Sequence, residues 1–221
     1  MGVFEGSLSF KTFYVEGEPP NGFHQDYLAK LQKHFFVPLT PVGEEDRSVG
    51  WVPVQDPIAE SFTHDQVFFN QYVVFGMRID KWALPSAWVK AMTRQAIAQR
   101  LPQVSKEEAK ILEDDGKLRS KAKLSKREKD KIKLEIITLV KQHILTSMKV
   151  IDVCWNIAER KLRFWSQSQA VCDEFAELFK ETFGLEIHED CPLLMAKDLG
   201  MTEKQLDAMV DLDPWYPSFE S

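Results

Sequence analysis

One segment in the middle of the chain, residues 117–133, gathers the side chains best suited to binding a polyanion. Its sequence, KLRSKAKLSKREKDKIK, contains nine Lys or Arg residues and only two acidic residues. The whole chain has 28 basic and 34 acidic side chains and a formal charge of −6. Lys and Arg side chains neutralise the phosphates of duplex DNA and release its condensed counterions. The segment therefore predicts a phosphate-binding surface on an otherwise acidic protein.

The predicted phosphate-binding residues are the cations of this segment and two arginines of the preceding helix. They are Lys117, Arg119, Lys121, Lys123, Lys126, Arg127, Lys129, Lys131 and Lys133, with Arg94 and Arg100. Lysine dominates the segment, and lysine is a flexible point charge rather than a bidentate reader of guanine. We expect binding to double-stranded DNA with little sequence preference. If about six cations contact phosphates, the log–log slope of affinity against salt is roughly −5.

The pattern departs from that of an ordinary solvated helix in two ways. Lys126 and Arg127 lie in the predicted first turn, where the helix dipole disfavours cations. Lys129 and Lys133 are four residues apart, so their like charges repel on one helix face. Because no residue of the sequence offsets these costs, a functional role is expected here.

The helix face that carries Lys129 and Lys133 changes from basic to apolar along the predicted helix. Lys129 and Lys133 precede Ile136 and Val140 on one face, so the stripe is basic for two turns and apolar afterwards. We expect the second half to contact a core and the first half to project into solvent.

The elements that must position this segment are helices and strands without regular alternation. Strands are expected at 8–15, 49–54, 67–79, 150–157, 162–164 and 185–189. Helices are expected at 23–36 and 84–101, from Ser105, from Ser125 to about 145, at 169–183 and from Thr202. This mixture is typical of the α+β class, with antiparallel sheet elements and packed helices. We expect one unit over 1–221, with 102–145 as a projecting basic helix–loop–helix arm.

Composition and short motifs exclude several classes of protein. No run of eighteen apolar residues occurs, so we expect no membrane span, and the start of the chain lacks a secretory signal. Three widely spaced cysteines indicate free thiols in a reducing cytoplasm. His188 and Cys191 could begin a metal site, but no second ligand pair follows, so no structural zinc is expected. Four tryptophans in apolar periodic segments are predicted to lie in the core: Trp51, Trp82, Trp88 and Trp155.

Several segments, taken in order, resemble one known family. They are VGWVPV (49–54), MRIDKWALPSAWVKAM (77–92), KLSKREKDKIKLEI (123–136), CWNIAERKLRFWSQS (154–168) and FAELFKETFG (175–184). Together they resemble the RdgC family of recombination-associated proteins. The family's Lys-rich helix, K-x-E-K-x-x-x-K, corresponds here to Lys126, Glu128-Lys129 and Lys133.

The resemblance implies a protein that is not an enzyme, needs no cofactor and binds double-stranded DNA with little sequence preference. RdgC-like proteins form a ring-shaped homodimer around a positively lined hole and limit the access of the RecA recombinase to DNA. We therefore expect a homodimer in the cytoplasm, associated with the nucleoid, with a RecA-type recombinase as a further partner. Because family members commonly continue beyond the matching region, this chain is expected to be a shortened member.

Two other functions stay open. Asp152, Glu159 and Lys161 faintly resemble the D…E-x-K pattern of a metal-dependent nuclease, although a solvated hairpin tip is the more ordinary interpretation. Alternatively, the basic helix binds an acidic protein partner or an acidic face of its own dimer. The sequence contains no phosphate-binding glycine loop, so nucleotide-driven chemistry is not expected.

Overall fold

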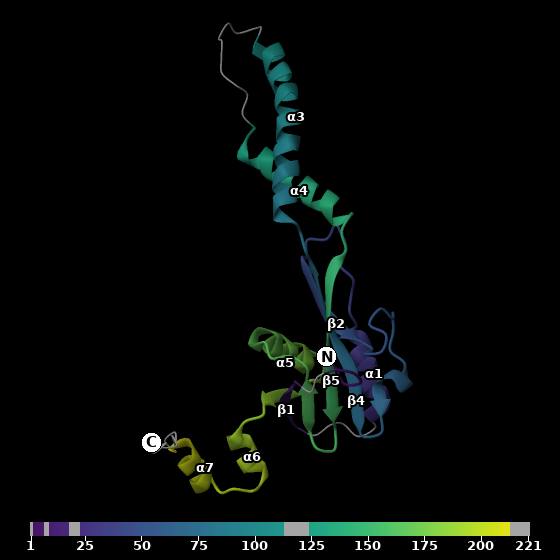
Figure 1. The fold of residues 1–221 in the computed structure, drawn as a ribbon, viewed down its shortest axis with the longest axis vertical. Helices are drawn as coiled ribbons and strands as arrows, with labels where there is room; N and C mark the ends of the chain where they lie inside the picture. The colour runs from purple at the N-terminus through teal and green to yellow at the C-terminus, as the bar shows by residue number, and fades with distance from the viewer. Residues whose placement is uncertain (1, 7–8, 18–22, 113–123, 213–221) are drawn as a thin grey trace, which may run out of the picture. The chain divides into compact units, whose positions relative to one another are not determined.

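The computed structural model describes residues 2–6, 9–17, 23–112 and 124–212 (Figure 1). The first half of the chain contains β1 (Lys11–Glu16), α1 (Phe23–Lys33), β2 (Arg47–Val52), α2 (His64–Val67), β3 (Phe68–Phe69), β4 (Tyr72–Trp82) and α3 (Ser86–Leu112). The second half contains α4 (Lys126–Lys141), β5 (Thr146–Asn156), β6 (Lys161–Phe164), α5 (Gln169–Phe183), β7 (Glu186–Glu189), α6 (Pro192–Asp198) and α7 (Glu203–Val210).

The strands form one sheet in the order β2-β4-β5-β6-β1-β7, and β3 pairs with β4. Strand β1 pairs antiparallel with both β6 and β7, and the pairs β5–β6 and β3–β4 are also antiparallel. Helices occupy more of the chain than strands do and do not alternate with them. The predicted α+β class is therefore confirmed.

The chain divides into two compact units. The first comprises Met1–Phe36, Gly50–Arg78 and Val150–Ser221, and the second comprises Val37–Val49 and Ile79–Lys149. The predicted arm, 102–145, falls within the second unit, and its predicted loop, 113–123, lies outside the described residues. That the chain is a single unit with this segment projecting from it stays a prediction.

An aromatic cluster fills the core of the first unit. Helix α5 contributes Phe175, Phe179 and Phe183, whose spacing of four residues places them on one face. The ring of Phe175 stacks on that of Phe164 from β6, with centroids 4.1 Å apart. Such rings bury large apolar areas, so the sheet and α5 stabilise each other.

Trp51 is anchored in this core by both its ring and its backbone. Its Nε1 donates a 2.7 Å hydrogen bond to the hydroxyl of Thr182 on α5. Its backbone N–H donates to the carbonyl of His34, and its carbonyl accepts from the N–H of Phe36, each at 3.0 Å. A Cβ on the preceding Gly50 would lie 2.5 Å from the Cα of Phe36, so this close approach requires glycine.

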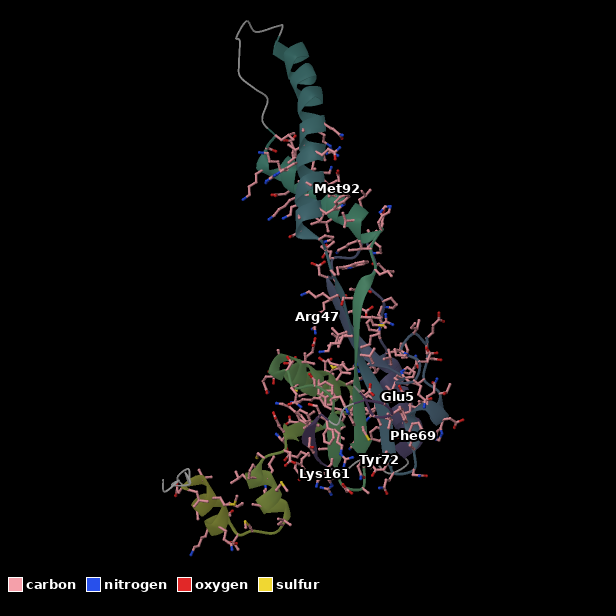
Figure 2. All side chains as sticks on the ribbon, viewed as in Figure 1. Glu5, Arg47, Phe69, Tyr72, Met92 and Lys161 are labelled. Atoms are coloured by element: carbon pink, nitrogen blue, oxygen red, sulfur yellow. The ribbon has the colours of Figure 1, made fainter. Side chains whose placement is uncertain are left out.

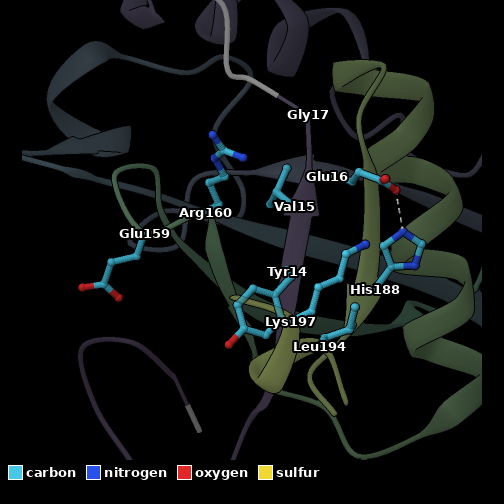
Figure 3. Close-up of a pocket in the computed structure, with 9 residues that line it drawn as sticks. All are labelled: Tyr14, Val15, Glu16, Gly17, Glu159, Arg160, His188, Leu194 and Lys197. Carbon is cyan, nitrogen blue, oxygen red and sulfur yellow. Dashed lines mark hydrogen bonds and ion pairs between the residues drawn. The ribbon is translucent and has the colours of Figure 1, made fainter. Parts of the chain in front are cut away.

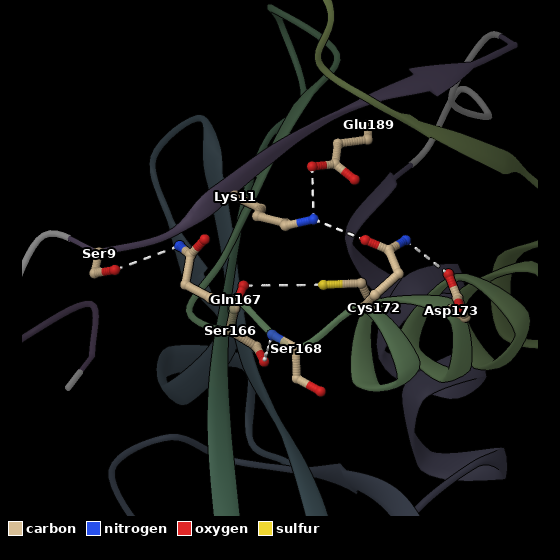
Figure 4. A network of polar contacts seen from close by, with 9 residues as sticks. Ser9, Lys11, Ser166, Gln167, Ser168, Cys172, Asp173 and Glu189 are labelled. Atoms are coloured by element: carbon tan, nitrogen blue, oxygen red, sulfur yellow. Dashed lines mark hydrogen bonds and ion pairs between the residues drawn. The ribbon is translucent and has the colours of Figure 1, made fainter.

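A polar network joins β1 to the start of α5 (Figure 4). The Nζ of Lys11 pairs with Glu189 at 2.7 Å and donates to the side chain of Gln169 at 3.0 Å. Gln169 in turn donates to Asp173 at 3.0 Å.

The three cysteines are free, as predicted, and Cys154 and Cys172 are buried.

Two predicted elements differ from the structure. The predicted strand 67–79 is the hairpin β3–β4, because Asn70 adopts a left-handed φ of 54° and reverses the chain. The helix predicted to begin at Ser105 does not, since α3 runs continuously from Ser86 to Leu112. A Ser-x-x-Glu pattern marks a helix start only where the preceding backbone is extended, and here it is helical.

The remaining differences concern element ends and a tryptophan. Helix α4 ends at Lys141 rather than near 145, and β5 begins at Thr146. Trp51, Trp82 and Trp155 are buried as predicted, whereas the prediction for Trp88 is wrong, since it is 62% exposed. Its neighbour Val89 is the buried residue of this turn, because consecutive helical side chains point about 100° apart.

Candidate nucleic-acid interface

Helix α4 begins at a complete capping box. The backbone N–H of Glu128 donates to the Ser125 hydroxyl oxygen at 3.3 Å, and the Glu128 carboxylate accepts from the Ser125 backbone N–H at 2.7 Å. The hydroxyl of Ser125 also donates to that carboxylate at 2.7 Å. These hydrogen bonds hold the pKa of Glu128 below its ordinary value. The predicted helix start is confirmed, and the carboxylate of Glu128 is engaged in the cap.

Five predicted phosphate-binding residues lie on the described part of α4, and all are exposed. They are Lys126, Arg127, Lys129, Lys131 and Lys133. Within the described residues, none of the five forms an ion pair. The helical repeat places Lys126, Lys129 and Lys133 on one face and Arg127 and Lys131 on another. The cations therefore flank the helix on two sides rather than forming a single stripe.

The apolar side of α4 differs from the expected one. Ile132 is 1% exposed and Leu124, just before the helix, is 6% exposed, so the basic half of the segment also contacts a core. Ile132, Ile136 and Val140 form the inward-facing row, and α4 packs against α3, which it crosses obliquely (Figure 1). The expectation that only the second half contacts a core is wrong. The side chain of Ile132 is buried although its neighbours Lys131 and Lys133 are exposed, because consecutive side chains of a helix point in different directions.

The two arginines of α3 differ in their contacts. Arg94 is exposed and, within the described residues, forms no ion pair. Arg100 pairs with Glu135 of α4 at 2.7 Å, with both side chains about half exposed. Arg100 is therefore already neutralised by the protein itself. Lys117, Arg119, Lys121 and Lys123 lie outside the described residues, so their predicted role stays a prediction.

Lys141, at the end of α4, is buried and ion-paired. Its side chain is only 6% exposed, its Nζ pairs with Asp46 at 2.8 Å, and the same atom lies 5.7 Å from the ring centre of Trp82. Lys141 belongs to the packing of the unit, in contrast to the five exposed cations nearer the start of the helix.

An apolar groove of about 520 Å³ lies between the start of α3 and the end of α4. Its lining includes Trp88 and Met92 from α3 and Leu139 from α4; Met92 is labelled in Figure 2. The sequence did not distinguish this surface from core, since Trp88 and Met92 repeat at the four-residue spacing that core positions also show.

The residues of the nuclease alternative do not assemble. Asp152 is buried on β5 and accepts a 2.7 Å hydrogen bond from the backbone N–H of Val3, whereas Glu159 is exposed in the β5–β6 turn. The two carboxylates line different cavities. Burial raises the pKa of Asp152, which opposes the ionised form that a metal ligand needs. In the described part of the chain, the one group of three potential metal ligands contains neither of them.

Comparison of the chain with models of known protein families gives no match, and comparison with curated proteins gives none either. Among the described residues there is no helix with the length and apolar character needed to cross a bilayer.

Proposed function

We propose that the protein binds double-stranded DNA without sequence preference, through phosphate contacts made by α4. One observation carries the proposal: five exposed cations of α4 have no ion-pair partner within the described residues. Cations that a protein leaves unpaired on a helix repel one another, and a polyanion offsets that repulsion.

The dimensions of the helix fit this ligand. Lys126 and Lys133 are seven residues apart, which corresponds to about 10 Å along a helix axis. Duplex DNA presents about six phosphate charges over the same length. Lysine contacts phosphate as a flexible point charge, so the helix needs no fixed register on the duplex.

The wider role that we propose rests on the resemblance to RdgC-like proteins. In that role the protein is a non-enzymatic homodimer that coats or encircles duplex DNA and limits the access of a RecA-type recombinase. The location of Lys126, Glu128-Lys129 and Lys133 on one exposed, capped helix supports carrying over the family's Lys-rich element. Association with the nucleoid follows from the same proposal.

Fluorescence anisotropy with labelled duplexes of unrelated sequence tests DNA binding. We expect equal affinities for the duplexes and a log–log salt slope of about −4 to −5, if the five α4 cations all contact phosphates. A slope near zero, or strong preference for one sequence, would contradict the proposal. Acidic polypeptide in place of DNA serves as the comparison, because tighter binding to it would favour the protein-interaction function.

A further inference from the structure

The edge of the sheet where β1 meets β7 brings three potential metal ligands together. Glu16 on β1 lies directly opposite Glu186 on β7 in the antiparallel register, and His188 follows two residues later. Directly opposed residues share a face of the sheet, and so do residues two apart on one strand. The backbone therefore places all three side chains on one face.

The ligand atoms of these side chains are close. The Nε2 of His188 lies 2.9 Å from Oε2 of Glu16, as Figure 3 shows. One ligand atom from each of Glu16, Glu186 and His188 lies within 4.8 Å of the other two. An ion bound at about 2.0–2.2 Å to each ligand needs them roughly 3–3.5 Å apart. Exposed glutamate side chains reach that separation by rotamer changes alone.

Two carboxylates face each other at this edge, because Glu16 lies opposite Glu186. Like charges directly opposite each other on paired strands are destabilising. The ammonium of Lys180 bonds Oε1 of Glu186 and offsets part of this repulsion. The second carboxylate oxygen of Glu186 retains lone pairs for a further ligand bond. Glu16 has only the imidazole of His188 as a partner in the described residues.

A cavity adjoins two of the three side chains, those of Glu16 and His188. Its volume is about 500 Å³, and its lining includes Glu16 and His188 together with Tyr14, Arg160 and Lys197 (Figure 3). An ion held at this edge would therefore have room for water or a small anion on its cavity side. Three protein ligands with one open position are the arrangement found in zinc sites that bind water or substrate.

We propose that Glu16, Glu186 and His188 bind a divalent transition-metal ion of the zinc type, with an open coordination position towards the cavity. The imidazole decides the class of ion, because nitrogen ligands suit zinc and its neighbours, whereas Mg²⁺ and Ca²⁺ prefer oxygen alone. This site is independent of α4 and of DNA binding. It is also distinct from a His188–Cys191 site, because the group of three contains no cysteine.

Titration calorimetry with Zn²⁺, followed by Co²⁺ absorption spectroscopy, tests the proposal. We expect one saturable Zn²⁺ per chain and a visible Co²⁺ spectrum of mixed nitrogen and oxygen ligation. His188→Ala and Glu16→Gln should each weaken Zn²⁺ binding by at least about ten-fold. Both side chains are exposed, so folding should be retained, and circular dichroism checks this.

His64→Ala is the matched control, since His64 is another exposed histidine beside a carboxylate, 3.5 Å from Asp65. Its Zn²⁺ affinity should equal that of the unmodified chain. Absence of saturable binding, or equal affinity in the His188→Ala variant, would overturn the proposal. Loss of binding on Cys191→Ser with retention in Glu16→Gln would also overturn it, because the ion would then use a different ligand set.

Discussion

Arg100 and Glu135 form an ion pair of 2.7 Å that joins helices α3 and α4. The pair divides the predicted phosphate-binding residues into two groups. Arg100 is neutralised by the protein, whereas the five exposed cations of α4 have no such partner within the described residues. Arg100 and the five exposed cations of α4 should therefore contribute differently to DNA binding, which mutations can test.

Replacing Glu135 by Gln should strengthen DNA binding, because it removes one anion and frees Arg100. We expect a salt slope steeper by about 0.9 and an affinity several-fold higher at low salt, measured by anisotropy. The exposed pair contributes at most about 1 kcal/mol to stability, so folding should persist. Glu177→Gln makes the same charge change at an exposed position of α5. Equal effects of the two variants would show that net charge, not Arg100, is responsible.

Replacing Ser125 by Ala should destabilise α4, since both halves of the capping box depend on this residue. The expected loss in the free energy of unfolding is about 1 kcal/mol. The pKa of Glu128 lies below its ordinary value of 4.5, so this carboxylate stabilises the fold fully above pH 4.5 and less as pH falls through the lowered value. The difference between the variant and the unmodified chain should therefore shrink in acid. Ser61→Ala, in an exposed loop, should change neither quantity.

Lys129 and Lys141 should respond oppositely to replacement by Ala, although both belong to α4. Lys129→Ala should reduce the salt slope by about 0.9, weaken binding to all duplexes alike and leave stability within about 0.5 kcal/mol. Lys141→Ala should leave the slope unchanged and lower stability by about 1 kcal/mol or more, since its buried stem and its pair with Asp46 are lost. Denaturant titration and anisotropy on the same samples separate the two effects. A reduced slope for Lys141→Ala would place that lysine at the interface instead.

Replacing Asp152 by Asn should stabilise the protein at neutral pH. Burial raises the pKa of Asp152 above its ordinary value of 3.8, so the unmodified chain loses stability as pH rises from 3.8 through the raised value. Asn keeps an oxygen that accepts from the N–H of Val3 and has no charge to bury. The stability gain, measured by denaturant titration, should therefore vanish below about pH 3.8. A constant gain at every pH would contradict a titrating, buried Asp152.

The sequence predicted elements well where local signals and burial agree. The helix start at Ser125, the strands β5 and β6 and the helix α5 were all predicted from short patterns. The predictions were wrong where one sequence pattern is compatible with two different structures. Ser105 and Glu108 resemble a helix start inside a continuous helix, and Trp88 has core spacing on an exposed turn.

The candidate site was predictable only in part, for a physical reason. Charge composition identifies exposed cations such as Lys126 and Lys133, because a lysine cluster cannot be buried without partners. It cannot show which cations the protein itself neutralises, since Arg100 and Glu135 are 35 residues apart in sequence. The grouping of Glu16 with His188 was equally hidden, because a strand pairing across 172 residues creates it.

Reversing the charge of α4 removes the cations that we propose bind phosphate. The variant combines Lys126→Glu, Arg127→Glu, Lys129→Glu and Lys133→Glu, and acidic residues in the first helical turn are favourable, so α4 should persist. The control makes the same total charge change at exposed positions outside α3 and α4: Lys33, Lys149, Arg163 and Lys204, all to Glu.

The measurement is the affinity of both variants for a labelled duplex, by gel shift and anisotropy. We expect the α4 variant to lose detectable binding, while the control keeps most of the affinity of the unmodified chain. Unchanged binding by the α4 variant, or equal loss in both, would contradict phosphate binding by α4.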